Sequence, residues 1–119
     1  MPDQTTRLFV VYDGTALPDP VYRAVSTCPP RLDDFRSHDS LGLPYRRVLF
    51  VRAVGISVFS TPQALNRARK RFNLAHATAA LDLHIAEIAW AETGRPDHLT
   101  VWAAPSVLLD RVLQCEHAH

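Results

Sequence analysis

The chain has 119 residues, of which 47% are hydrophobic and 21% charged, and its formal net charge is +1. These values are typical of one globular domain spanning residues 1–119, and they exclude a disordered chain. The longest early apolar run, residues 8–12, is too short for a signal-peptide core or a membrane-spanning helix. We therefore expect a cytoplasmic protein with no membrane partner.

The first elements are predicted strands. Residues 8–12 form a β-branched and aromatic run that ends at a turn pair, Asp13 and Gly14. Residues 21–26 predict a second strand, on which Arg23 points the same way as Val21 and Val25, into a partly enclosed place. The proline-rich stretch 28–45 predicts a long loop with at most one helical turn.

The middle of the chain predicts a strand followed by a helix. Residues 47–59 are the strongest strand signal, and Gly55 marks a bulge or a join between two strands. Thr61 and Pro62 are typical of an N-cap and a first helical position, so a helix is predicted over 62–72. On this helix Leu65, Ala68 and Phe72 share one face, which leaves the basic residues outside.

The segment 74–91 fits both helical and strand spacing. A strand over 82–91 is favoured, because the turn cluster 93–97 and the β-type run 99–102 would complete a hairpin. Pro105 and Ser106 begin a last amphipathic turn or helix. Together these elements predict an α/β fold of the α+β type, with a mixed sheet of five or six short strands and one or two short helices packed on it.

The two cysteines, Cys28 and Cys115, lie far apart, and neither belongs to a Cys-x-x-Cys pair. A reducing compartment, free thiols and no disulfide are the expectation. The tail contains Cys115, Glu116, His117 and His119, but a frayed terminus is a poor place to fix metal geometry. No metal is expected.

Charge is distributed unevenly along the chain. Residues 40–81 contain no Asp or Glu and carry +7, whereas the remainder carries −6. This block predicts a surface that binds an anion or a partner, nucleic acid included. The alternative is a solvated helix face balanced by acidic loops of the same molecule. The residues proposed for the surface are Arg46, Arg47, Arg52, Arg67, Lys70 and Arg71.

Common catalytic motifs are absent from the sequence, including a Gly-rich phosphate loop, His-Glu-x-x-His and Gly-x-Ser-x-Gly. His84 and Glu87 share a face only if their segment is helical. His98 follows Asp97 at the start of a β-run and is a candidate general base; the alternative is a structural histidine.

One ordered set of residues remains. Residues 21–24 read Val-Tyr-Arg-Ala, residues 55–61 read Gly-Ile-Ser-Val-Phe-Ser-Thr, a helix with Ala64 and Ala68 follows, and residues 85–88 read Ile-Ala-Glu-Ile. This order resembles small bacterial ADP-ribosyltransferase-like domains. In such domains an early strand supplies an Arg or His that holds NAD, a middle strand supplies a Ser or aromatic residue near the nicotinamide, and a late strand supplies an acid.

By this resemblance Arg23, Ser57 and Glu87 would be catalytic, with Glu92 and Glu116 as competing acids, and Arg23, Ser57 and Phe59 would bind NAD. The chemistry is coherent, because a guanidinium can grip a pyrophosphate and an aromatic ring can stack on nicotinamide. The resemblance implies an NAD-dependent enzyme, such as a bacterial or phage toxin, that modifies a macromolecular target. The alternative is a non-catalytic accessory, antitoxin or immunity-type module that binds protein or nucleic acid through its basic surface.

Overall fold

The computed structural model describes residues 10–17, 20–37 and 55–117. Within them the elements follow in the order β1 (Tyr12–Asp13), β2 (Val21–Val25), β3 (Ile56–Phe59), α3 (Pro62–Phe72), β4 (Ala77–Leu81), β5 (Ala89–Glu92), β6 (His98–Trp102), α4 (Pro105–Leu109) and β7 (Val112–His117), with short 3-10 turns at Gly14–Ala16 and Leu32–Phe35. One sheet with short helices packed on it confirms the predicted α+β class.

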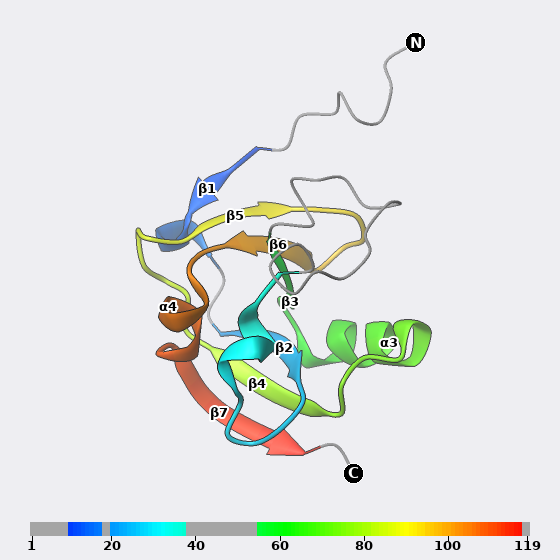
Figure 1. Cartoon of the computed structure of the whole chain (residues 1–119). Helices are drawn as coiled ribbons and strands as arrows, with labels where there is room; N and C mark the ends of the chain where they lie inside the picture. Colours follow the sequence, from blue (N-terminus) through cyan, green and yellow to red (C-terminus); the bar gives the residue numbers. More distant parts are fainter. Residues whose placement is uncertain (1–9, 18–19, 38–54, 118–119) are drawn as a thin grey trace.

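The seven described strands form one sheet in the order β1-β5-β6-β3-β2-β4-β7. All of their pairings are antiparallel, whereas a mixed sheet was expected. The described sheet has seven strands, one more than the five or six expected. The sheet bends strongly, so that β5 and β6 lie across from β2, β4 and β7 (Figure 1).

The junction between β2 and β3 is the weak point of the ladder. These strands pair at one position, Tyr22 with Phe59, whereas β2 and β4 pair along their whole length, from Val21–Leu81 to Val25–Ala77. Beyond Tyr22 the two strands diverge, and Arg23 and Ser57 lie at the divergence. The candidate site described below is built there.

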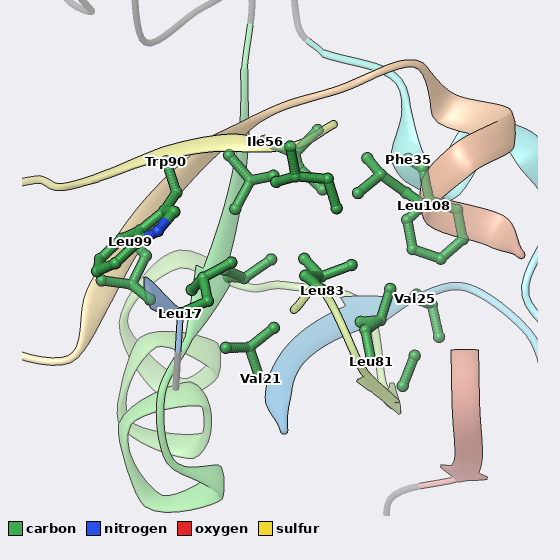
Figure 2. Close-up of a cluster of buried hydrophobic side chains, with 14 of the residues drawn as sticks. Leu17, Val21, Val25, Phe35, Ile56, Leu81, Leu83, Trp90, Leu99 and Leu108 are labelled. Carbon is green, nitrogen blue, oxygen red and sulfur yellow. The ribbon is translucent and has the colours of Figure 1, made fainter. Parts of the chain in front are cut away.

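The main core fills the concave side of the bent sheet. Val21, Val25 and Leu81 come from one half of the sheet, and Trp90 and Leu99 come from the other (Figure 2). Phe35 and Leu108 close the core at one end, where the 3-10 turn Leu32–Phe35 meets α4. Along β4 burial alternates, with Ala77, Ala79 and Leu81 buried, so one face of this strand points into the core.

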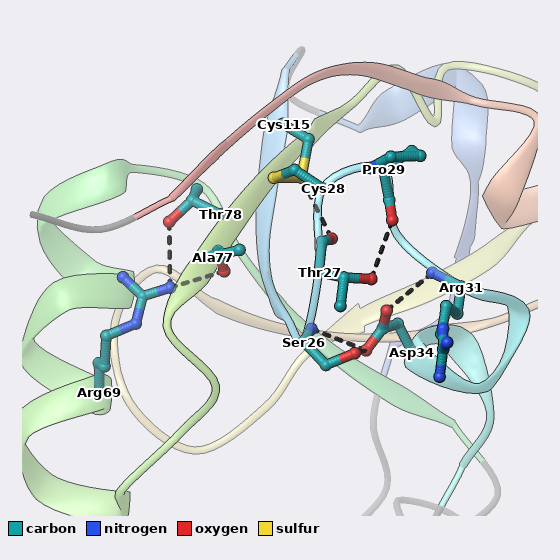
Figure 3. Close-up of a disulfide and its surroundings, with 10 residues drawn as sticks. All are labelled: Ser26, Thr27, Cys28, Pro29, Arg31, Asp34, Arg69, Ala77, Thr78 and Cys115. Carbon is teal, nitrogen blue, oxygen red and sulfur yellow. Dashed lines mark hydrogen bonds between the residues drawn. A yellow bond between two sulfur atoms is a disulfide. The ribbon is translucent and has the colours of Figure 1, made fainter.

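Helix α3 covers the other face of the sheet, against β2 and β3. It begins as predicted, because the Thr61 hydroxyl accepts a hydrogen bond from the amide of Ala64 at 3.1 Å. Leu65 is fully buried, but Phe72 is 60% exposed, so the expectation that Phe72 faces the core is wrong. Arg69 turns inward instead, and its guanidinium donates to the carbonyl of Ala77 and to the Thr78 hydroxyl (Figure 3).

Several strand boundaries differ from those expected. Residues 82–91 do not form one strand: β4 ends at Leu81, a turn follows, and β5 begins at Ala89. The β5–β6 hairpin is confirmed by the pairing of Glu92 with Leu99. The strand β7 was not foreseen. Predicted strand residues 8–9 and 47–54 lie outside the described residues.

A disulfide joins Cys28 to Cys115, which lie 87 residues apart in the sequence with their Cα atoms 5.5 Å apart (Figure 3). The expectation of free thiols is therefore wrong. The reason lies in the topology: Cys28 follows β2, Cys115 lies on β7, and β4 pairs with both strands. In the described part of the chain, no helix has the length and apolar character needed to cross a membrane.

Candidate functional site

A cavity of about 1140 Å³ opens between α3, the divergent ends of β2 and β3, and the turn between β5 and β6. Six of the described residues that line it are cationic, and the described lining contains no Asp or Glu. Arg23 lies inside. The other five are named the basic rim: Arg36, Arg67, Lys70, Arg71 and Arg95. Such a lining favours an anionic ligand, because low-dielectric walls strengthen the field of the charges.

Arg23 bridges the gap in the sheet with its side chain. Its Nε donates to the carbonyl of Asp34 and its Nη1 donates to the carbonyl of Ser57, both at 2.7 Å. Burial lowers the pKa of Arg23 to about 10, and the Asp34 carboxylate opposes that shift, so the guanidinium is charged at neutral pH. A guanidinium has five N–H donors, and these two bonds leave donors on Nη1 and Nη2 for a ligand.

Asp34 fixes the loop that holds Arg23. Its carboxylate accepts hydrogen bonds from the amide and hydroxyl of Ser26, at 2.9 and 2.8 Å, and from the amide of Arg31 at 2.8 Å (Figure 3). Its carbonyl is thereby held at the end of β2, where it receives the bond from Arg23. The Cys28–Cys115 disulfide lies in the same loop and ties it to β7.

A second set of polar contacts lies beside Arg23. The Nε2 atom of His98 lies 2.9 Å from the Ser57 hydroxyl, and its Nδ1 atom lies 2.6 Å from the carbonyl of Thr93. The Thr93 hydroxyl lies 3.0 Å from the same Nδ1 and 2.7 Å from the hydroxyl of Thr100. Strands β3 and β6 are neighbours, and this pairing brings Ser57 and His98 together.

The aromatic ring of Phe59 forms part of the same wall. It packs edge-to-face on the His98 ring, with centroids 5.3 Å apart, and it is 7% exposed. Gly55 directly precedes β3, and a Cβ added there would fall 2.9 Å from the carbonyl oxygen of Val101. The glycine therefore allows β3 to lie against β6 at the cavity floor.

The structure brings together three residues of the proposed NAD site, Arg23, Ser57 and Phe59, at one cavity. It does not bring the acids there. Glu87 is exposed in the turn between β4 and β5, and Glu92 is exposed at the end of β5. Glu116 lies on β7 and lines a separate cavity of about 70 Å³.

The proposed anion-binding residues divide in two groups. Arg67, Lys70 and Arg71 are exposed on α3 and belong to the basic rim. The proposed residues Arg46, Arg47 and Arg52 lie outside the described part of the chain. Sequence reasoning missed Arg36 and Arg95, which come from loops and join the rim through the fold. It named His98 as a candidate base but did not connect it to Ser57, since they are 41 residues apart.

Compared with protein-family models, with curated proteins and with solved structures, the chain matches none of them.

Proposed function

We propose that the chain is a small ADP-ribosyltransferase-like domain that binds NAD in the basic cavity and modifies a macromolecular target. The observation that carries the proposal is the convergence of Arg23 from an early strand with Ser57 and Phe59 from a middle strand on one cavity. This order of residue types is the one in which the sequence resembles such domains. The cavity is large enough for a dinucleotide, since ligand sites commonly measure about 300–1000 Å³.

The electrostatics of the cavity favour the same ligand. The pyrophosphate of NAD carries two negative charges, and the remaining donors of Arg23 together with the rim cations can bind them. The planar nicotinamide would lie near Phe59 and His98. Two parts of NAD are thus matched, the pyrophosphate by cations and the nicotinamide by rings.

The resemblance implies an acidic residue on a late strand, but the late strand at this cavity, β6, carries a histidine instead. Strand β6 presents His98 to Ser57, and no Asp or Glu is found among the described lining residues. In this proposal His98 takes the part of the base. Glu87 has no part in it, because it lies on a turn away from the cavity lining.

The test is a titration of the purified protein with NAD by isothermal calorimetry, followed by incubation of labelled NAD with protein and cell lysate. Binding in wild type, weakened at least tenfold in Arg23→Ala, together with label transferred to a lysate component, is the expected result. The proposal fails if wild type neither binds NAD nor consumes it.

A second candidate function is non-catalytic docking of an anionic partner on the basic rim. The observation that favours it is the end of α3, where the Arg71 guanidinium lies 5.9 Å from the centroid of the exposed Phe72 ring. Cations beside an exposed aromatic ring are typical of surfaces that bind single-stranded nucleic acid, because phosphates and bases are both bound.

A cytoplasmic place of action, as for a toxin acting inside a cell, is part of the first proposal. The disulfide is more typical of proteins that fold in an oxidising compartment. An effector that is exported and then acts in a cytoplasm would account for both the disulfide and the cytoplasmic place of action. Alkylation of free thiols in intact cells, followed by mass spectrometry of Cys28 and Cys115, would show which state the protein has where it acts.

A further inference from the structure

The contacts of His98 give its two ring nitrogens different roles. The carbonyl of Thr93 is an acceptor, so the Nδ1 atom of His98, at 2.6 Å from it, donates a hydrogen bond to it. In the neutral imidazole this arrangement places the lone pair on Nε2, where the Ser57 hydroxyl at 2.9 Å can donate to it. This is the arrangement of a hydroxyl next to a general base that is oriented by a third group.

The imidazole is held in this orientation from several sides. The Thr93 and Thr100 hydroxyls form a buried pair behind Nδ1, and each residue is 2% exposed. Phe59 packs on the ring edge-to-face. Ser57 is itself fixed, because it pairs with Thr100 in the β3–β6 ladder and its carbonyl accepts from Arg23.

Ser57 is exposed, and it lines the cavity proposed to hold NAD. We infer that Ser57 is a modification site, the hydroxyl to which the protein transfers the ADP-ribosyl group of its own bound NAD. This inference rests on the proposed function, and it names an acceptor within the chain.

The step balances without any further reactant. The bond between C1′ of the ribose and the nicotinamide nitrogen breaks, and its electron pair leaves with the neutral nicotinamide. A bond forms between Ser57 Oγ and C1′, and the hydroxyl proton passes to Nε2 of His98 and from there to water. The product is an O-glycoside whose leaving group is far poorer than nicotinamide, so the ADP-ribosyl group stays attached and occupies the cavity.

The chain provides a matched control in Ser60. This serine lies three positions after Ser57, and its hydroxyl donates to the Asp97 carboxylate at 2.7 Å. Its partner is a carboxylate on a turn and not an imidazole, so the inference predicts no transfer to Ser60.

The experiment is intact mass spectrometry of the purified chain before and after incubation with NAD, with peptide mapping of the modified residue. Calorimetry with NAD accompanies it for each variant. Wild type is expected to gain one ADP-ribosyl group, on Ser57, and Ser60→Ala is expected to do the same. Ser57→Ala is expected to gain no ADP-ribosyl group, whereas Ser57→Cys keeps a nucleophile at the same position and is expected to be modified there. His98→Asn is expected to slow the modification by about 10²–10⁴-fold, the usual contribution of a general base.

Two results overturn the inference and are distinguishable. If wild type binds NAD but Ser57 remains unmodified, the inference is wrong and the proposed NAD site stands. If wild type does not bind NAD, the proposed function fails and this inference fails with it.

Discussion

Arg23 and Ser57 face each other where β2 and β3 diverge, and Nη1 of Arg23 donates to the carbonyl oxygen of Ser57 at 2.7 Å. A side chain thus replaces the main-chain hydrogen bond that a closed ladder would place there. The same guanidinium binds the carbonyl of Asp34. It therefore holds the loop, β2 and β3 around the mouth of the cavity.

Replacing Arg23 by Lys tests this bridging role. An ammonium group keeps the charge but lacks the planar fork, so it cannot satisfy both carbonyls as the guanidinium does. We expect a loss of about 1–3 kcal/mol in the free energy of unfolding, because one carbonyl loses its charged donor. Urea unfolding followed by circular dichroism measures it. Arg67→Lys, on the exposed face of α3, is the control and should lie within about 0.5 kcal/mol of wild type. Equal stabilities of both variants would show that the bridge contributes nothing.

Local patterns predicted helix α3 to the residue, because capping by Thr61 and the fixed φ of Pro62 depend on a few adjacent positions. Strand β2 was predicted for a similar reason. The turn after Leu81 was missed, because the alternation of residues 82–91 also fits a loop whose apolar side chains, such as Leu83 and Ile88, are buried by distant elements.

The candidate site was predicted in part for the same physical reason. Arg23, Ser57 and Phe59 could be named from their strands, but the approach of His98 to Ser57 depends on β6 pairing with β3. Strand order is set by long-range packing, so no short segment of the sequence determines it. The disulfide was missed because it depends on the order β2-β4-β7.

The basic rim makes a prediction that does not depend on catalysis. Replacing Arg67, Lys70 and Arg71 together by Gln should weaken binding of a single-stranded oligonucleotide and flatten its salt dependence. For single strands the slope of log K against log salt is about −0.7 per phosphate contact, so losing three contacts should reduce it by about 2. Fluorescence anisotropy of a labelled oligonucleotide across a salt series is the measurement.

Two further variants complete that experiment. Arg31→Gln removes an exposed charge that is not among the residues lining the cavity, and should leave the slope unchanged. Phe72→Ala should weaken binding at every salt concentration by about 1–3 kcal/mol, since stacking does not depend on counterions. An absence of binding by wild type at low salt would remove nucleic acid as a partner of the rim.

Gly55→Ala should destabilise the protein through the close approach of β3 to β6. The added Cβ would lie 2.7 Å from Cγ2 of Thr100 and 2.9 Å from the carbonyl oxygen of Val101, and a paired backbone carbonyl cannot move away easily. We expect a loss of about 1–3 kcal/mol, as for other overpacked sites. The midpoint of urea unfolding reports it, and an unchanged midpoint would mean that β3 and β6 can separate at no cost.

The Cys28–Cys115 bond should stabilise the fold by restricting the unfolded chain. The bond closes a sequence separation of 87 residues, and disulfides of native domains typically contribute about 2–4 kcal/mol. A reducing agent should therefore lower the stability of wild type by this amount and leave a Cys28→Ser, Cys115→Ser double variant unaffected. Wild type that unfolds at the same urea concentration with and without reductant would contradict the prediction.

The long separation of the two cysteines also has a consequence for biosynthesis. Cys28 leaves the ribosome 87 residues before its partner, which corresponds to roughly 4–17 s at common elongation rates. During that interval β7, the strand that carries Cys115, is incomplete, and the thiol of Cys28 is open to capping by small oxidants or to pairing with another nascent chain. The yield of correctly bonded protein should therefore depend on the thiol chemistry of the cell while translation is in progress, before any folded molecule exists.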